Sequence, residues 1–304
     1  MPVIAIISCR IFEDEVIQLI KGESGLEEVI IVKNENSFGL IRKLEETGSF
    51  TPYSALEIEE IHESLGRERT EERIREQAGK ETEEEVKEKT EKGVKKETEE
   101  IEGNKKDLNL TLVVNVLGFA LEGFPDRLKE AVYETIEDAK GYSDAVLLLY
   151  GLCGNVLGSV EQDFGASGFP VFILTDAEGE IVDDCVGAVL GGRGAFLSKL
   201  KAEGTGTYFL TPVGAAYWKE ILVASRITPD PENIEMTKMV FDYSGYKNVA
   251  KVDTGLHYEK DFETRVREFA DSFGFEIVNM EGSPELIERC YEKAKGEVLR
   301  KKKT

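Results

Sequence analysis

Short apolar runs alternate with stretches of helical spacing along most of the chain. Residues 3–8 form a continuous apolar run, and residues 11–21 follow with large apolar side chains at helical intervals. A continuous run suits a strand buried on both faces, whereas apolar side chains three or four positions apart suit one face of a helix. Further strands are predicted over 29–32, 110–117, 145–150, 171–175, 207–210, 248–252 and 275–279, and further helices over 37–46, 125–139, 186–201, 215–223, 259–273 and 284–299.

This alternation of strands and helices predicts the fold class. Parallel neighbours in a sheet need a crossover connection, which is usually a helix. We therefore expect an α/β protein with a mainly parallel sheet, or two smaller sheets, covered by helices on both faces. Sheets of this kind bind ligands beyond the carboxyl ends of their strands, so residues that directly follow strands are candidates for a site.

One stretch of the chain interrupts the pattern. Between residues 64 and 107 the composition changes to mainly Glu, Lys, Arg and Thr. Large apolar residues are too few there for a packed core, so we expect a charged insertion, helical or disordered, without chemistry of its own. The insertion would separate an N-terminal α/β segment of the core, 1–63, from a main α/β domain with the cysteine motifs, 108–304.

The chain is strongly acidic. Asp and Glu number 60 against 38 Lys and Arg, which gives a net charge of −22 over 304 residues. Phosphate backbones and anionic membranes attract clustered positive charge, so we expect no nucleic-acid partner and no membrane partner. The sequence has neither a run of 18 apolar residues nor a signal-peptide pattern, so we expect a cytoplasmic location.

Three of the four cysteines lie where predicted elements end or begin. Cys9 and Cys153 each come directly after or just beyond a predicted strand, and Cys185 lies beside a predicted helix start. A helix N-terminus lowers the pKa of a neighbouring thiol, and thiolates favour iron-sulfur clusters, zinc or cuprous copper. We predict that Cys9, Cys153 and Cys185 are ligands of a shared iron-sulfur cluster or zinc ion. The alternative for each is packing as a small buried hydrophobic residue, the role we assign to Cys290.

Residues around these cysteines could complete a binding site. Glycines allow backbone amides to approach a ligand, and a carboxylate could orient or neutralise a metal. The candidates for cofactor binding are Gly151, Gly154, Asn155, Asp183, Asp184, Gly191, Gly192, Thr207 and Tyr208. Since no serine-nucleophile elbow, zincin helix or kinase signature is present, the sequence assigns no catalytic residue.

Three motifs carry a resemblance to a known family: YGLCGN at 150–155, DDCVGAVLGG at 183–192 and GTYFLTP at 206–212. In their order and spacing the chain resembles domain of unknown function 1638, an uncharacterised family common in methanogenic archaea and anaerobic bacteria. The resemblance implies that the cysteines belong to a pattern shared by the family. Genes of the family are often associated with corrinoid-dependent methyl transfer, so the resemblance also implies an anaerobic one-carbon context.

These observations support one leading hypothesis and two alternatives. The leading hypothesis is a thiolate-ligated metal or iron-sulfur protein with a redox or accessory role in corrinoid-linked methyl-group metabolism. Its partners would be corrinoid or methyltransferase proteins, with a small-molecule ligand also possible at the site. One alternative is a cysteine-dependent enzyme on a small substrate, with an anion pocket at 151–155. The other is a non-catalytic module that binds a protein through the acidic surface or the insertion.

Overall fold

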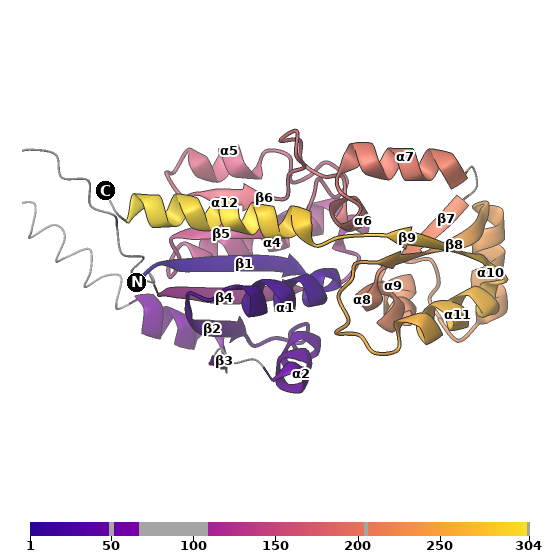
Figure 1. Ribbon diagram of the computed structural model, residues 1–304, viewed down its shortest axis with the longest axis horizontal. Coiled ribbons are helices and arrows are strands. Elements are labelled where there is room, and N and C mark those ends of the chain that lie inside the picture. Colours follow the sequence, from indigo (N-terminus) through magenta and orange to yellow (C-terminus); the bar gives the residue numbers. More distant parts are fainter. Residues whose placement is uncertain (49–51, 67–108, 204–205, 303–304) are drawn as a thin grey trace, which may run out of the picture.

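The computed structural model describes residues 1–48, 52–66, 109–203 and 206–302 (Figure 1). A helix occupies 58–66, up to the end of that described segment. The charged insertion predicted at 64–107 lies outside the described residues except for 64–66, so its helical or disordered character stays a prediction.

A parallel sheet of six strands forms the larger half of the described molecule. Its strands are β1 (Val3–Cys9), β2 (Leu26–Val32), β3 (Tyr53–Leu56), β4 (Leu110–Leu117), β5 (Ala145–Leu149) and β6 (Val171–Ile173), in the order β3-β2-β4-β1-β5-β6. Every residue of the central strand β1 is buried, as expected for a strand covered on both faces. The sheet unites strands from both sides of the insertion, which confirms the predicted α/β class.

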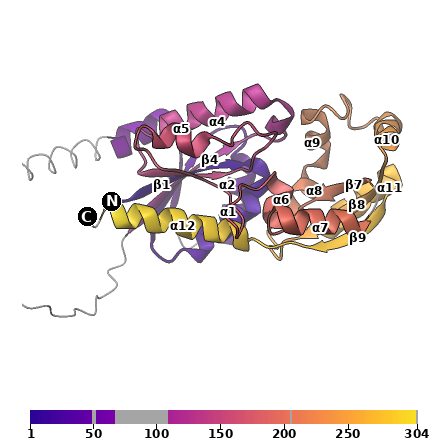
Figure 2. The same cartoon turned by 90° about the horizontal axis from the view of Figure 1, so that it is seen from above.

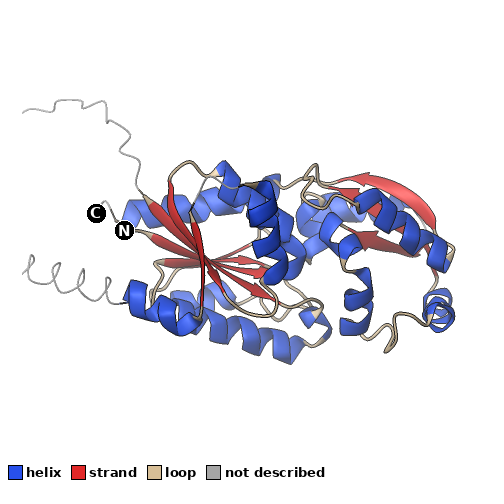
Figure 3. Cartoon of the chain, turned by 90° about the horizontal axis from the view of Figure 1, so that it is seen from below, coloured by secondary structure: helices blue, strands red, loops and turns tan. Residues whose placement is uncertain are grey.

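Helices cover both faces of this sheet. One face carries α1 (Glu13–Gly22) and α12 (Glu285–Lys301), and the other carries α4 (Pro125–Ala139) and α5 (Val160–Gly165), as Figure 2 shows. The helix α2 (Phe38–Thr47) packs on α1. Figure 3 shows the strands as one twisted layer between these helices.

The strand order creates a crevice at the carboxyl edge of the larger sheet. From β1 the chain passes through α1 to β2, whereas from β4 it passes through α4 on the opposite face to β5. Adjacent strands whose connections leave over opposite faces open a crevice beyond their carboxyl ends, where sheets of this type bind ligands. Cys9, the last residue of β1, lies at this position.

A second parallel sheet forms the smaller half. It contains β7 (Gly206–Leu210), β8 (Tyr246–Asp253) and β9 (Glu276–Glu281), in that order. Around it lie α8 (Pro212–Ala216), α9 (Trp218–Ala224), α10 (Ile234–Tyr243) and α11 (Phe262–Phe273). An aromatic cluster forms a core of its own, with Trp218, Phe241, Phe269 and Phe273 buried in it. The strands predicted after residue 205 thus build a separate sheet.

Two crossings join the halves. The chain leaves the larger sheet through α6 (Cys185–Val189) and α7 (Arg193–Glu203), and it returns from β9 to α12. The crossings meet where the Ser283 N–H donates a hydrogen bond to the Val189 carbonyl at 2.8 Å. One continuous helix was predicted over 186–201, and this was wrong because Gly191 and Gly192 adopt φ values of 91° and 98° between α6 and α7.

No helix among the described residues is both long and apolar enough to cross a lipid bilayer.

Candidate functional site

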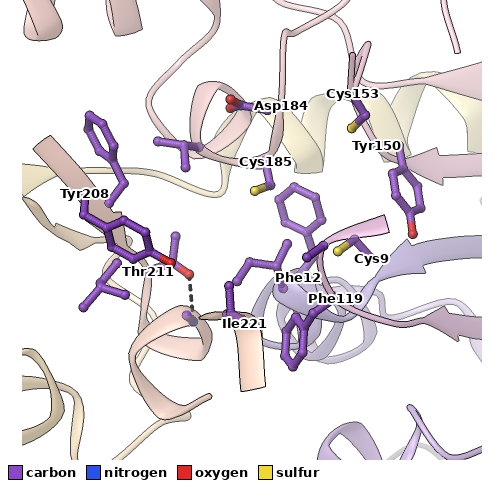
Figure 4. Close-up of a pocket in the computed structure, with 16 residues that line it drawn as sticks. Cys9, Phe12, Phe119, Tyr150, Cys153, Asp184, Cys185, Tyr208, Thr211 and Ile221 are labelled. Carbon is purple, nitrogen blue, oxygen red and sulfur yellow. Dashed lines mark hydrogen bonds between the residues drawn. The ribbon is translucent and has the colours of Figure 1, made fainter. Parts of the chain in front are cut away.

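A pocket of about 120 Å³ lies between the carboxyl edge of the larger sheet and the end of β7 in the smaller one (Figure 4). It is lined by Cys9, Ile11, Phe12, Phe119, Ala120, Tyr150, Cys153, Asp184, Cys185, Val186, Tyr208, Phe209, Leu210, Thr211, Gly214 and Ile221. The three cysteines predicted to share a site are all among these residues. Their convergence on one pocket is therefore found, while their role as metal ligands stays a prediction.

Cys9 is held by the end of the central strand. Its side chain lies beside the loop that follows β4, with Sγ 4.0 Å from the Gly118 carbonyl oxygen. The residue is 9% exposed, and it belongs to the lining of the pocket. The switch in strand order between β1 and β4 thus places a thiol at the head of the crevice.

Cys153 lies in a strained loop after β5. Its φ is 44°, and Gly154 and Asn155 follow with 78° and 66°, so three consecutive residues are left-handed. Glycine and asparagine tolerate this region, whereas a cysteine there costs about 1 kcal/mol. Strain of this kind persists only where surrounding contacts fix the backbone, which indicates that the loop has a defined shape.

Backbone contacts fix this loop against the segment before Cys185. The Leu152 N–H donates to the Val182 carbonyl at 2.8 Å, and the Cys153 N–H donates to the Asp183 carbonyl at 2.9 Å. A side chain at Gly151 would place Cβ 2.3 Å from the same Val182 carbonyl oxygen. Gly151 therefore serves the approach of two chain segments, and the two loops that carry cysteines are joined by their backbones.

Cys185 opens the short helix α6. The preceding residue, Asp184, caps this helix, and its Oδ1 accepts a hydrogen bond from the Gly187 N–H at 2.7 Å. Burial raises the pKa of Asp184, and the hydrogen bonds from the Gly187 and Val186 amides oppose this effect. Cys185 is half-buried, whereas Cys9 and Cys153 are buried. The pocket thus combines three thiols with a carboxyl group that burial makes easier to protonate.

The three thiols line the pocket from the end of β1, the loop after β5 and the start of α6 (Figure 4). In the part of the chain that the structure describes, no three Cys, His, Asp or Glu side chains are grouped closely enough to hold a metal ion as they stand. The three thiols as they stand therefore do not form a metal site, and coordination would require their Sγ atoms to move closer together.

The other predicted binding residues divide into two groups. Asp184 and Tyr208 line the pocket. Those outside its lining are Gly151, Gly154, Asn155, Asp183, Gly191, Gly192 and Thr207. Asp183 pairs instead with Arg193 at 3.4 Å, and a side chain at Gly192 would place Cβ 2.5 Å from the Cβ of Asp176. These two residues contact neighbouring segments of the chain rather than the pocket.

Cys290 lies apart from the pocket, as predicted. It is buried in α12, where its Sγ accepts a hydrogen bond from the Thr175 N–H at 3.4 Å. The fourth cysteine therefore has a packing role and offers an internal comparison for the other three.

Arg10, which the sequence analysis missed, joins the two halves beside the pocket. Its guanidinium lies 4.6 Å from the ring centre of Phe119 and 4.0 Å from that of Tyr217. It also pairs with Glu13 at 3.1 Å and with Glu220 at 2.9 Å. Two of these partners belong to the larger half and two to the smaller, so one side chain connects the loop after Cys9 to the opposite wall. No spacing in the sequence signals such a contact.

A buried group of charges lies next to Arg10. The Lys43 ammonium is 2.9 Å from Glu13, 2.7 Å from Asp14 and 2.7 Å from Glu259. Burial raises the pKa of Asp14 to about 6, although Lys43 opposes this shift. Burial, together with the Asp14 charge, raises the pKa of Glu15 to about 8. Because Glu259 comes from the smaller half, this group is a second connection between the halves.

Comparison with known proteins gives one result. The family described as "Protein of unknown function (DUF1638)" matches residues 116–291, which is more than half of the chain and includes Cys153 and Cys185. No curated protein matches the chain, and no solved structure matches it.

Proposed function

Because the chain belongs to the DUF1638 family of proteins of unknown function, we propose a function from its pocket: binding of an iron-sulfur cluster or a zinc ion through Cys9, Cys153 and Cys185. The observation that carries this proposal is the convergence of three thiols, from three separate segments of the chain, on one pocket. Cys290, the cysteine with a packing role, lies outside this pocket, whereas the other three line it.

The donor set favours a soft metal. Thiolates bind zinc, cuprous copper and iron-sulfur clusters, whereas Mg²⁺ and Ca²⁺ prefer oxygen. Three protein thiolates leave one position open, either on one iron of a four-iron cluster or on a zinc ion. Three thiolates from separate segments of the chain would suit a cluster, because each thiolate could then bind a different iron.

Electrostatics also favours a bound cation. Three deprotonated thiols beside Asp184 would place several negative charges in a mainly apolar space. Among the described residues that line the pocket, none is Lys, Arg or His. Uncompensated charge in such a space is costly, so a metal centre would supply the positive charge that the thiolates need.

The biological role follows from the family context. We propose a redox or accessory role in corrinoid-linked methyl-group metabolism, with corrinoid or methyltransferase proteins as partners. The support is the membership of the chain in this family, and a centre held by three thiolates would keep one coordination position for a ligand.

A second candidate is a cysteine-dependent enzyme that acts on a small substrate. The observation in its favour is the greater exposure of Cys185 compared with Cys9 and Cys153. This candidate predicts rapid alkylation of Cys185 alone, with no metal bound.

Purification without oxygen tests the first proposal. We expect a brown protein with iron and acid-labile sulfide, or a colourless protein with stoichiometric zinc. Cys153→Ala should lose most of the metal, and Cys290→Ala, which removes the one cysteine outside the pocket, should keep it. A folded wild-type protein that binds neither iron nor zinc, even after reconstitution, would contradict the proposal.

A further inference from the structure

The wall of the pocket that faces the cysteines is apolar. The smaller half contributes Phe209, Leu210 and Ile221, and the larger half contributes Phe12 and Phe119. Apolar surface of this kind gains about 25 cal/mol for each Å² that a ligand covers. Any molecule that reaches the thiols therefore lies against hydrocarbon on its other side.

Cationic side chains do not contribute to this wall. None of the described residues lining the pocket is Lys, Arg or His. The guanidinium nearest in sequence to a pocket cysteine, that of Arg10, is paired with Glu13 at 3.1 Å and Glu220 at 2.9 Å. The ionisable carboxyl group in the lining, Asp184, would repel an anion when charged.

The pocket still offers polar contacts for one end of a ligand. The Thr211 Oγ1 accepts a hydrogen bond from the Gly214 N–H at 3.1 Å, which leaves its own O–H to donate. Asp184 lies on the same lining. A neutral molecule with one polar group fits these two surfaces. Its polar group would contact Thr211 or Asp184, and the rest of the molecule would lie on the apolar wall.

We infer that the pocket takes a small, uncharged and mainly apolar molecule between this wall and the thiols, and that it excludes carboxylates and phosphates. A buried carboxylate without a cationic partner costs several kcal/mol more than a neutral amide of the same shape, and an alkyl group has no such cost. The inference rests on the proposed function only in taking this molecule as the ligand of the open metal position. The selectivity itself needs no metal.

Two alkylating reagents of nearly the same shape test this selectivity. With both reagents the thiolate sulfur forms a bond to the CH₂ carbon while the carbon–iodine bond breaks and iodide leaves, so iodoacetamide transfers a neutral carbamidomethyl group and iodoacetate transfers an anionic carboxymethyl group. The rates would be measured on metal-free, full-length protein, for each cysteine by peptide mass spectrometry. For each cysteine, the rate with iodoacetamide is divided by the rate with iodoacetate, and this ratio is then divided by the same ratio in the urea-unfolded chain. Salt at 1 M keeps the Debye length at about 3 Å, so that the net charge of the protein contributes little to the rates.

The inference predicts that Cys153 and Cys185 prefer the neutral reagent by about tenfold or more after this correction. A corrected ratio within about twofold of one at both cysteines would overturn it.

A matched pair of variants locates the effect. Ile221 and Val223 lie on the same helix, α9, but Ile221 lines the pocket whereas Val223 is 41% exposed and outside the lining. Ile221→Lys should reduce the corrected preference at least threefold, and Val223→Lys should leave it unchanged. An equal change of the corrected preference in Ile221→Lys and Val223→Lys would show that the preference does not arise in the pocket. Should Ile221→Lys fail to fold by circular dichroism, the wild-type ratio alone decides.

The outcome is separable from that of the proposed function. Metal-free wild-type protein that keeps the preference after failed reconstitution would remove the metal proposal and keep this inference. Wild-type protein that binds metal but shows no preference for the neutral reagent when metal-free would keep the metal proposal and remove this inference.

Discussion

The backbone N–H of Cys153 donates a hydrogen bond to the carbonyl oxygen of Asp183 at 2.9 Å. Asp183 lies two residues before Cys185, so this bond ties the loop after β5 to the start of α6. Two of the three pocket thiols are therefore positioned by one backbone junction, and the geometry of the site depends on backbone hydrogen bonds as well as on its side chains.

Gly151 tests this junction. In Gly151→Ala the new Cβ would meet the Val182 carbonyl oxygen at 2.3 Å, and a backbone atom cannot move aside as a flexible side chain can. We expect a loss of about 1–3 kcal/mol in unfolding free energy and a loss of bound metal. Gly165→Ala on α5 is the control, because its Cβ would meet nothing within 4 Å, and it should change stability by less than about 1 kcal/mol. Equal stability and metal content in the two variants would refute the role of the junction.

Lys43 tests the buried charges. Lys43→Met would leave Glu13, Asp14 and Glu259 without their common partner, and we expect a loss of about 3–5 kcal/mol in urea unfolding. The control is Lys33→Met, which breaks a pair with Glu57 in which both side chains are more than half exposed, and should change stability by no more than about 1 kcal/mol. Similar losses in the two variants would show that burial does not matter here.

Glu15 gives a pH dependence with a definite sign. Burial first, and the Asp14 charge second, raise its pKa from 4.5 to about 8. The folded chain thus keeps a proton that the unfolded chain releases near pH 4.5, so this group makes stability fall as pH rises from about 4.5 to about 8, and its effect is constant above that. Glu15→Gln should remove this part of the slope in unfolding free energy. If the unfolding free energy of Glu15→Gln and that of the exposed control Glu27→Gln both depended on pH as in the wild type, the pH dependence would not come from Glu15.

Arg10 should keep the two halves together over the pocket. Arg10→Met removes the contacts with Phe119 and Tyr217 and the pairs with Glu13 and Glu220, and we expect Cys185 to react with iodoacetamide about tenfold faster in metal-free protein. Arg42→Met, which removes a more exposed arginine from Glu259, should change this rate little. A rate for Arg10→Met equal to the wild-type rate would show that access to the pocket does not depend on Arg10.

The sequence predicted the larger sheet well because its signal is local. Strands such as β1 and β5 are continuous apolar runs, because a strand that is buried on both faces needs apolar side chains on both. The placement of Cys9 and Cys153 at the carboxyl edge followed directly from those runs. Convergence with Cys185 depended on topology, and the parallel order of the strands supplied it.

The rest could not be predicted because it depends on contacts between distant segments. The acids at the start of α1 look like a solvated first turn, yet Glu13, Asp14 and Glu15 are buried because Lys43 and the smaller half cover them. From the sequence, Gly151 was expected to let backbone amides approach a ligand. In the structure it instead allows the loop after β5 to approach the backbone of Val182 closely. Ile221 of the apolar wall lies on α9, a helix beside the second sheet, and the sequence predicted the strands of that sheet without separating them from the first sheet.

The reactivity of the four cysteines tests the central claim most directly. Protein purified without oxygen would be alkylated before and after removal of its metal, with each cysteine quantified separately. The account predicts that Cys9, Cys153 and Cys185 are protected at first and become reactive together when the metal leaves, while Cys290 stays unreactive in α12 throughout. Three pocket cysteines whose reactivities are unrelated to one another and unaffected by metal removal would contradict it.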